Sequence, residues 1–236
     1  MTDGNHYQSV AIGFNALARS STSNPYYNIA IGAYAGDSIS SGDRNICIGH
    51  QARSYYNNSS NGIAIGYQAK YGHNHCTSVG YLAASSMYLQ SDYCTVLGSQ
   101  AGYDLDGGDY NTFVGYQSGY GGGSGGYNTG SGSSALYALV SGSTNSAYGA
   151  SALYNLTSGS ENSAIGTAAG ALVTEGDYNT FLGRDAGYRQ SSSTTNGLTT
   201  GDNVTCVGYA AIPTSSTATN EITLGDNNVT SLRCNT

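Results

Sequence analysis

The sequence predicts an all-β fold, a β-solenoid or β-roll of about thirteen coils with roughly 17 residues in each. The first observation is a glycine, preceded by an apolar residue, that recurs along the chain, and seven of its twelve intervals share one length. The second is that other residue types keep step with this anchor glycine. The third is composition, because each of the 35 glycines would cost about 1 kcal/mol relative to alanine inside a helix. The anchors are Gly13, Gly32, Gly49, Gly66, Gly80, Gly98, Gly115, Gly132, Gly149, Gly166, Gly183, Gly208 and Gly225.

Each anchor closes a short predicted strand. Positions are counted from the anchor, so that position −1 precedes it and position +3 follows it at a distance of three. Residues 28–32, Asn-Ile-Ala-Ile-Gly, place β-branched residues before a glycine that can turn freely. Position −1 holds Ile, Val or Leu in eleven of thirteen copies, and we assign these side chains to the core. Strands of successive coils would pair in register at about 4.8 Å, so the intervals would give a rod of roughly 60 Å.

Further registers complete the predicted coil. Alanine occupies position +3 in eleven of thirteen copies, where we expect backbones to crowd. Asparagine at −4 and glycine at −7 each occur seven times, and the glycine predicts a second turn. Cys47 and Cys206 stand where other copies have alanine, which predicts small buried fillers; the five cysteines form neither a disulfide framework nor a zinc site. Apolar side chains at position +7 are also assigned to the core: Ile39, Met87, Leu105, Leu139, Leu156 and Val173.

A coil this thin turns few apolar side chains inward, so a single chain would be marginally stable. Some strands are apolar at both −3 and −1, for example Val10 with Ile12 and Ile29 with Ile31. Such strands offer a second apolar side to a partner. We therefore predict that more than one chain builds the fold.

Tyrosine is concentrated in three registers. Fifteen of the 22 tyrosines lie at −5, +1 or +5, so stacked coils would carry them as ladders along the rod. Such ladders could be platforms for sugar rings, or stacked aromatics that protect the coil surface. Possible receptor contacts are Tyr103, Tyr120, Tyr188 and Arg189.

One interval departs most from the period. The interval from Gly183 to Gly208 is about half as long again as the common one. The sequence thus divides into a repeat shaft at 1–188, a loop insertion at 189–202, and a segment at 203–236 with the last two coils. The insertion would be either a partner-binding loop or a solvated one.

Charge and patterning exclude several classes of protein. The net charge of −7 and the pI near 4.7 leave no basic stripe for a phosphate backbone, so we expect no nucleic acid partner. No apolar run is long enough to span a membrane, and residues 1–14 lack a signal-peptide pattern, so we expect no membrane insertion and no conventional export.

Candidate chemical sites all have a simpler interpretation. Asp104 and Asp106 resemble the opening of a calcium loop, but no Glu completes it. His73 and His75 alternate, so on a strand they would point to one side, and three chains would supply six nitrogens to a metal. The alternative is a surface pair without metal. We assign no catalytic, cofactor or metal residues and predict that the chain is not an enzyme, although acids paired across chains stay open.

Three segments resemble known families. Residues 110–120 and 178–188 resemble the repeats of phage and bacterial tail-fibre-like proteins. Residues 28–32 and 162–166 are similar to head repeats of trimeric autotransporter adhesins. Residues 220–235 resemble the segment that precedes the self-cleaving intramolecular chaperone of endosialidase-type tail fibres.

The resemblance implies a function as well as a fold. It implies an intertwined or side-by-side homotrimer, templated by a C-terminal chaperone that is later removed, with residues 203–236 as the junction to it. It further implies a tail or fibre protein of a tailed phage virion, assembled in the host cytoplasm, that contacts other virion tail proteins and a host cell-surface receptor or glycan. The alternatives are a glycan-degrading tailspike, a bacterial surface adhesin, and an ice- or matrix-binding solenoid. Autotransporter adhesins need an export signal and a membrane anchor, which sets this chain apart from them.

Overall fold

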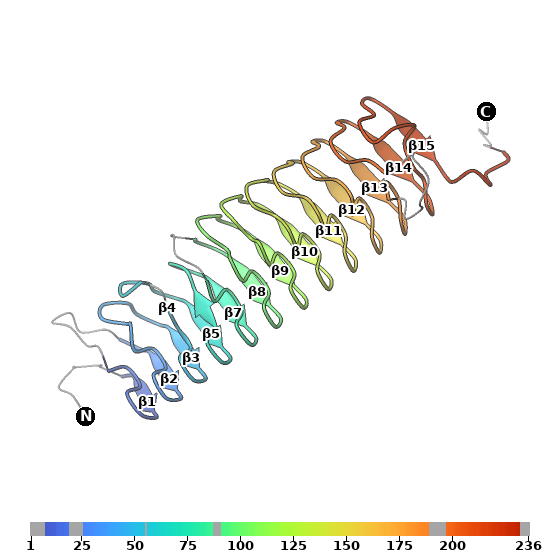
Figure 1. The fold of residues 1–236 in the computed structure, drawn as a ribbon. Helices are drawn as coiled ribbons and strands as arrows, with labels where there is room; N and C mark the ends of the chain where they lie inside the picture. The colour runs from blue at the N-terminus through green and yellow to red at the C-terminus, as the bar shows by residue number, and fades with distance from the viewer. Residues whose placement is uncertain (1–7, 19–25, 55, 87–90, 189–196, 232–236) are drawn as a thin grey trace, which may run out of the picture.

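The chain folds into a parallel β-solenoid of about 11 turns (Figure 1). The computed structural model describes residues 8–18, 26–54, 56–86, 91–188 and 197–231, and these residues contain no helix. The all-β solenoid is therefore confirmed. The expectation of thirteen coils is slightly too high.

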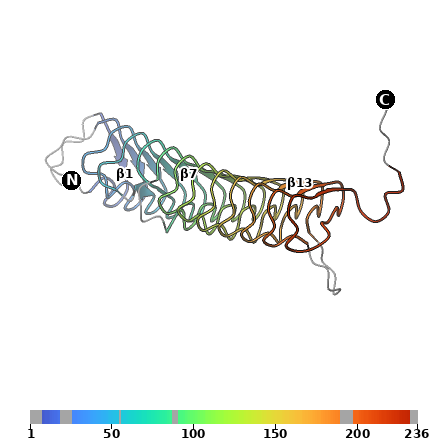
Figure 2. The ribbon, with the colours of Figure 1, turned by 90° about the horizontal axis from the view of Figure 1, so that it is seen from above.

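One parallel sheet runs the length of the rod. Its thirteen strands follow one another in chain order, and β1 and β15 lie at opposite ends (Figures 1 and 2). A second, two-stranded sheet pairs β4 with β6. The strands are β1 (Val10–Ile12), β2 (Ile29–Ile31), β3 (Ile46–Ile48), β4 (Arg53–Ser54), β5 (Ile63–Ile65), β6 (Lys70–Tyr71), β7 (Thr77–Val79), β8 (Thr95–Leu97), β9 (Thr112–Val114), β10 (Thr129–Ser131), β11 (Ser146–Tyr148), β12 (Ser163–Ile165), β13 (Thr180–Leu182), β14 (Thr205–Val207) and β15 (Ile222–Leu224).

Strand pairing keeps the sequence repeat in register. In the pair β10 and β11, for instance, Thr129 lies opposite Ser146 and Gly130 opposite Ala147, one repeat further along the chain. The shortened and lengthened coils keep the same alignment, since Ala64 pairs with Ser78 and Phe181 with Cys206. Every position counted from the anchor thus forms a column along the rod.

The core is a column of small and aromatic side chains inside the coil. From β2 to β14 of the main sheet the middle residue of each strand, position −2, points inward, and so does the alanine at +3. The predicted fillers Cys47 and Cys206 occupy the −2 column and are fully buried, as expected. The apolar side chains at position +7 are buried as predicted wherever the structure describes them, which leaves out Met87: Ile39, Leu105, Leu139, Leu156 and Val173.

The assignment of position −1 to the core was wrong. Ile12 is 58% exposed and Ile165 is 52% exposed. Successive residues of a strand point to opposite faces, and here positions −4 and −2 point inward, which leaves −3 and −1 on the outer face. The apolar side chains before the anchors therefore form a stripe on the outside of the sheet.

The anchor position requires glycine for two reasons. At Gly149 the backbone φ is +136°, a conformation that L side chains rarely adopt. A Cβ atom there would lie 2.5 Å from the carbonyl oxygen of Gly166 in the next coil. The close approach of successive coils thus fixes this residue, and the same contact recurs at the other anchors from Gly13 to Gly183.

Position −4 carries a buried asparagine ladder. The Asn162 N–H donates to Asn145 Oδ1 at 3.0 Å, and Asn145 Nδ2 donates to the Gly159 carbonyl at 2.8 Å. Each asparagine side chain therefore makes two hydrogen bonds to the backbone of the next coil. Its oxygen accepts the N–H at position −4, and its nitrogen donates to the carbonyl at position −7. All members of this ladder are fully buried: Asn28, Asn45, Asn111, Asn128, Asn145, Asn162 and Asn179.

A second polar ladder lies slightly earlier in the coil, at position −6. Here the side chain accepts from the backbone N–H of the preceding coil, as when the Asp92 N–H donates to Asp109 Oδ1 at 2.8 Å and the Ser160 N–H donates to Asp177 Oδ1 at 2.6 Å. Asp109 therefore belongs to the recurring turn, as the sequence indicated. The two ladders run in opposite directions and join each coil to both neighbours.

Candidate functional site

The +5 register presents a continuous tyrosine ladder. Tyr103, Tyr120, Tyr137 and Tyr154 stack on one another with ring centroids 4.9 to 5.1 Å apart and nearly parallel planes. This confirms the predicted ladder. Tyr120 and Tyr137 have a ring on both faces, so among the described residues of this ladder only Tyr103 and Tyr154 have a face without a stacked ring. Desolvation by its surroundings, with a smaller effect of Tyr103, raises the pKa of Tyr120.

The ladder is interrupted after Tyr154. The next coil has Ala171 at position +5, and the tyrosine returns at Tyr188. A pocket of about 350 Å³ lies at this vacant rung. It is lined by Ser151, Tyr154, Asn155, Ala168, Ala171, Leu172 and Tyr188. We name it the Ala171 slot.

Tyr188 also borders a second pocket, of about 190 Å³, toward the C-terminal end of the rod. Its other lining residues are Ala210, Ile212, Asp226, Asn227 and Asn228. Of the four candidate receptor contacts, the structure thus places Tyr188 between two pockets and puts Tyr103 and Tyr120 in the ladder. Arg189 lies outside the described residues, as do residues 189–196 of the predicted loop insertion.

A second aromatic ladder follows position −5. Tyr93, Tyr110 and Tyr127 stack with centroids 4.9 Å apart, and His75 stacks on Tyr93 at 5.1 Å with an interplanar angle of 1°. His75 thus occupies, at the start of this ladder, the position that tyrosine holds in the following coils. At position +1, Tyr67 stacks between His50 and Tyr81 at 5.4 and 5.5 Å.

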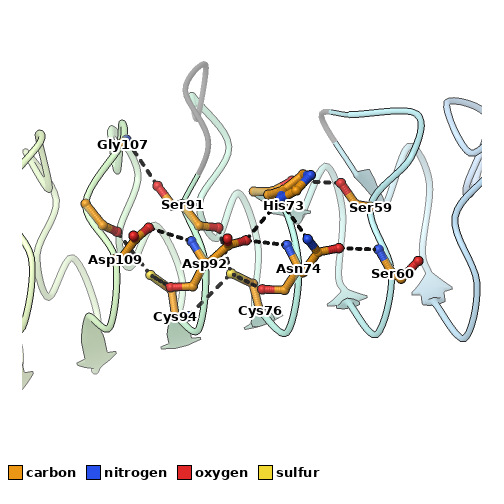
Figure 3. Close-up of polar contacts among 12 residues, drawn as sticks. Ser59, Ser60, His73, Asn74, Cys76, Ser91, Asp92, Cys94, Gly107 and Asp109 are labelled. Carbon is orange, nitrogen blue, oxygen red and sulfur yellow. Dashed lines mark hydrogen bonds and ion pairs between the residues drawn. The ribbon is translucent and has the colours of Figure 1, made fainter.

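The histidine pair does not point to one side. Residues 73–75 lie outside a strand, and His75 has a positive φ of 58°, so the expected alternation fails. His73 Nδ1 lies 3.1 Å from Asp92 Oδ1 (Figure 3). The His75 ring instead stacks on Tyr93. Asp92 also accepts the Asn74 N–H at 2.6 Å. Asp92 thus fastens the shortened coil to its neighbour through the −6 ladder.

Two cysteines replace asparagine in the buried −4 ladder (Figure 3). The Cys76 thiol donates to the Ser91 carbonyl at 3.1 Å, and Cys76 Sγ accepts the Cys94 N–H at 3.3 Å. Cys94 in turn donates to the Gly108 carbonyl at 3.3 Å. Each sulfur therefore reproduces a role of the asparagine amide in the ladder. Sequence reasoning missed this role, although both cysteines stand at position −4 of their coils.

The thiols differ in acidity. Burial raises the pKa of Cys47 to about 12 and that of Cys206 to about 11. The hydrogen bond with Cys94 lowers the pKa of Cys76, and the same contact, together with burial, raises the pKa of Cys94.

We predict that Cys47 and Cys206 resist alkylation in the native protein. The thiolate is the reactive form, and with these pKa values it is scarce at pH 8 and forms only as the pH approaches 11 to 12. Peptide mass spectrometry after iodoacetamide treatment should find both residues unmodified at pH 8 and modified once the chain is denatured. Rapid native labelling of either residue at pH 8 would contradict the burial described here.

The outer face of the sheet is apolar along much of its length. We give the name outer stripe to the side chains at position −1 of the thirteen strands. Ile31, Leu97 and Leu182 are 37, 47 and 45% exposed, and the stripe is interrupted only at Ser131 and Tyr148. At β1, β2, β3 and β5 position −3 is also Val or Ile, so the apolar surface is two columns wide there.

Other site types find less support among the residues described. Within the described ranges, no three His, Cys, Asp or Glu side chains gather closely enough to hold a metal ion. The same ranges hold no helix of the length and apolarity that a membrane crossing needs. Comparisons of the chain with family models, with curated proteins and with solved structures give no match.

Proposed function

We propose that the chain is a non-catalytic structural and host-binding fibre protein of a tailed phage virion, acting as a homotrimer that attaches to a cell-surface glycan. The observation that carries the proposal is the outer stripe, an exposed apolar surface that follows a long β-sheet. The resemblance of residues 110–120, 178–188 and 220–235 to tail-fibre segments supports the virion setting. On this proposal the chain contacts other tail proteins and folds with a C-terminal chaperone in the host cytoplasm.

The outer stripe favours further copies of the same chain as its partner. Soluble monomers rarely expose large contiguous apolar patches, so a surface of this kind marks an interaction site. The stripe recurs once in every coil, and a partner that covers it must match both that period and the length of the rod. A second and a third copy have both properties. All thirteen strands pair within one chain, so the copies would pack side by side and not exchange strands.

The contact should be strongest in the N-terminal third. There the outer face carries apolar residues at both −3 and −1, as with Ile29 and Ile31, whereas β7 to β14 have Thr or Ser at −3. Burial of apolar surface stabilises a contact by about 25 cal/mol for each Å² removed from water. Each coil of the two-column region therefore contributes more to the stability of the trimer than a coil with one apolar column.

We predict that Ile31→Lys converts the trimer to single chains. The substitution would place one lysine from each copy in the shared apolar interface, and burying an unpaired charge costs several kcal/mol. Light scattering of the unmodified chain should give three times its mass of 24.2 kDa, and the variant should give that mass once.

The matched control is Thr167→Lys, which adds the same charge at an exposed position that directly follows an anchor and is not part of the outer stripe. Its mass should equal that of the unmodified trimer. A single-chain mass for the unmodified protein at micromolar concentration would refute the fibre proposal.

A further inference from the structure

We propose that the Ala171 slot binds a neutral hexopyranose ring of a glycan, held between Tyr154 and Tyr188. The inference rests on the proposed host attachment for the source of the glycan, and it deepens that proposal by assigning a place and a ring type to the contact.

The two tyrosines that border the slot are separated by two coils, so the slot corresponds to one missing tyrosine of the +5 ladder. Neighbouring rungs of the +5 ladder are about 4.8 Å apart because they belong to adjacent paired coils, so Tyr154 and Tyr188 are attached to the rod about 10 Å apart. Ala171 is only 5% exposed and is one of the residues that line the gap. One sugar ring, inserted edge first, would take the place that tyrosine fills in the preceding coils.

The slot is also where ladder tyrosines have uncovered faces. A sugar ring binds an aromatic side chain by laying its C–H groups on the ring face, and the faces of Tyr120 and Tyr137 are already covered by neighbouring tyrosines. Tyr154 is covered by Tyr137 on one side and borders the slot on the other. Tyr188, from the coil beyond Ala171, lines the same pocket, so a ring in the slot would have a tyrosine as a neighbour on each side.

Polar groups at the rim suit hydroxyl groups. Asn155 Nδ2 donates to the Ala171 carbonyl at 2.9 Å, which fixes the side-chain amide and leaves Asn155 Oδ1 as an acceptor without a partner among the described residues. The Ser151 hydroxyl likewise has no hydrogen bond to any described residue and lines the same pocket. A pyranose has apolar faces and hydroxyl groups around its edge, whereas a flat aromatic ring would leave both rim groups unpaired.

Charge selects a neutral sugar. The lining residues include no Lys, Arg, Asp or Glu, and the chain has a net charge of −7. An acidic sugar would meet no cation in the slot and would be repelled by the protein as a whole.

Calorimetric titration of the full chain with linear glucan, mannan and galactan tetrasaccharides tests the proposal. At least one should bind with one site for each chain. Ala171→Tyr should weaken that binding by at least about tenfold, because it inserts the missing rung at a register that holds tyrosine in other coils. Tyr154→Ala should weaken it by about tenfold through loss of one wall. Tyr110→Ala, which removes a ring from the −5 ladder, is the matched control and should bind as the unmodified chain does.

Several results would overturn the slot. These are no binding of any of the three tetrasaccharides, full binding by Ala171→Tyr with native circular dichroism, or binding of a tyrosine-containing peptide in place of the sugars. A trimer that adsorbs to bacterial cells but binds no tetrasaccharide would overturn the slot and leave the proposed function standing. A monomeric protein that binds a tetrasaccharide, and loses that binding in Ala171→Tyr, would support the slot and overturn the proposed function.

Discussion

Gly149→Ala is expected to destabilise the centre of the rod by more than about 3 kcal/mol. The new Cβ atom would lie 2.5 Å from the Gly166 carbonyl oxygen and 2.6 Å from its carbon, closer than any real contact. The φ of +136° adds strain that no neighbouring side chain can relieve. The coils would have to separate, and the hydrogen bond from the Gly149 N–H to the Ser131 carbonyl, now 2.8 Å, would be disturbed.

Limited proteolysis and urea unfolding measure this effect. The variant should be cut near the altered coil under conditions where the unmodified chain stays intact, and its unfolding midpoint should fall. Ala150→Ser is the control, because residue 150 is adjacent, exposed and not part of the glycine column. It should unfold as the unmodified chain does. Equal midpoints for all three proteins would mean that the coils tolerate a methyl group at the anchor.

The repeat and its anchors were predictable because sterics leave a single choice there. A residue at the contact between successive coils has to be glycine, and the buried +3 column accepts little beyond alanine, so both positions keep their identity in almost every copy. The same holds for the tyrosine ladders. Residues at equal distances from the anchor stack by geometry alone, as Tyr103 and Tyr120 do.

The inward and outward faces of the strands could not be assigned from hydrophobicity. Strands such as β2 are apolar at −3, −2 and −1, so the pattern does not alternate between apolar and polar. The deciding residue is Asn28 at −4, which is fully buried although asparagine usually lies on the surface. A polar side chain that recurs in step with the anchor was the available signal for a buried ladder.

The candidate binding slot was partly visible in the sequence. The +5 register reads Tyr103, Tyr120, Tyr137 and Tyr154 and then Ala171 before Tyr188, so the missing rung can be found by counting. What counting could not give is that the gap is an open pocket with Asn155 at its rim. The expectation that His73 and His75 point to one side failed because the shortened coil changes the backbone conformation of these residues and not only their spacing.

Asn145→Ala is expected to cost about 2 to 6 kcal/mol, since it leaves two buried backbone groups without partners at about 1 to 3 kcal/mol each. The Asn162 N–H would lose its acceptor and the Gly159 carbonyl would lose its donor. Ser163→Ala, at an exposed outer position of the next coil, should change stability by less than about 0.5 kcal/mol. Urea unfolding compares the two variants with the unmodified chain.

Amide hydrogen exchange separates a local loss from a global one. In Asn145→Ala the Asn162 amide should exchange much faster, while amides several coils away, such as that of Asn45, should change far less, because each coil of a solenoid contacts mainly its neighbours. A second substitution in the adjacent rung, Asn128→Ala, should combine non-additively with the first, since Asn145 Nδ2 donates to Asn128 Oδ1 at 3.1 Å and either substitution alone removes that bond. Simple additivity of the two, or an unchanged Asn162 amide, would show that the asparagines act independently and do not form a continuous hydrogen-bonded ladder.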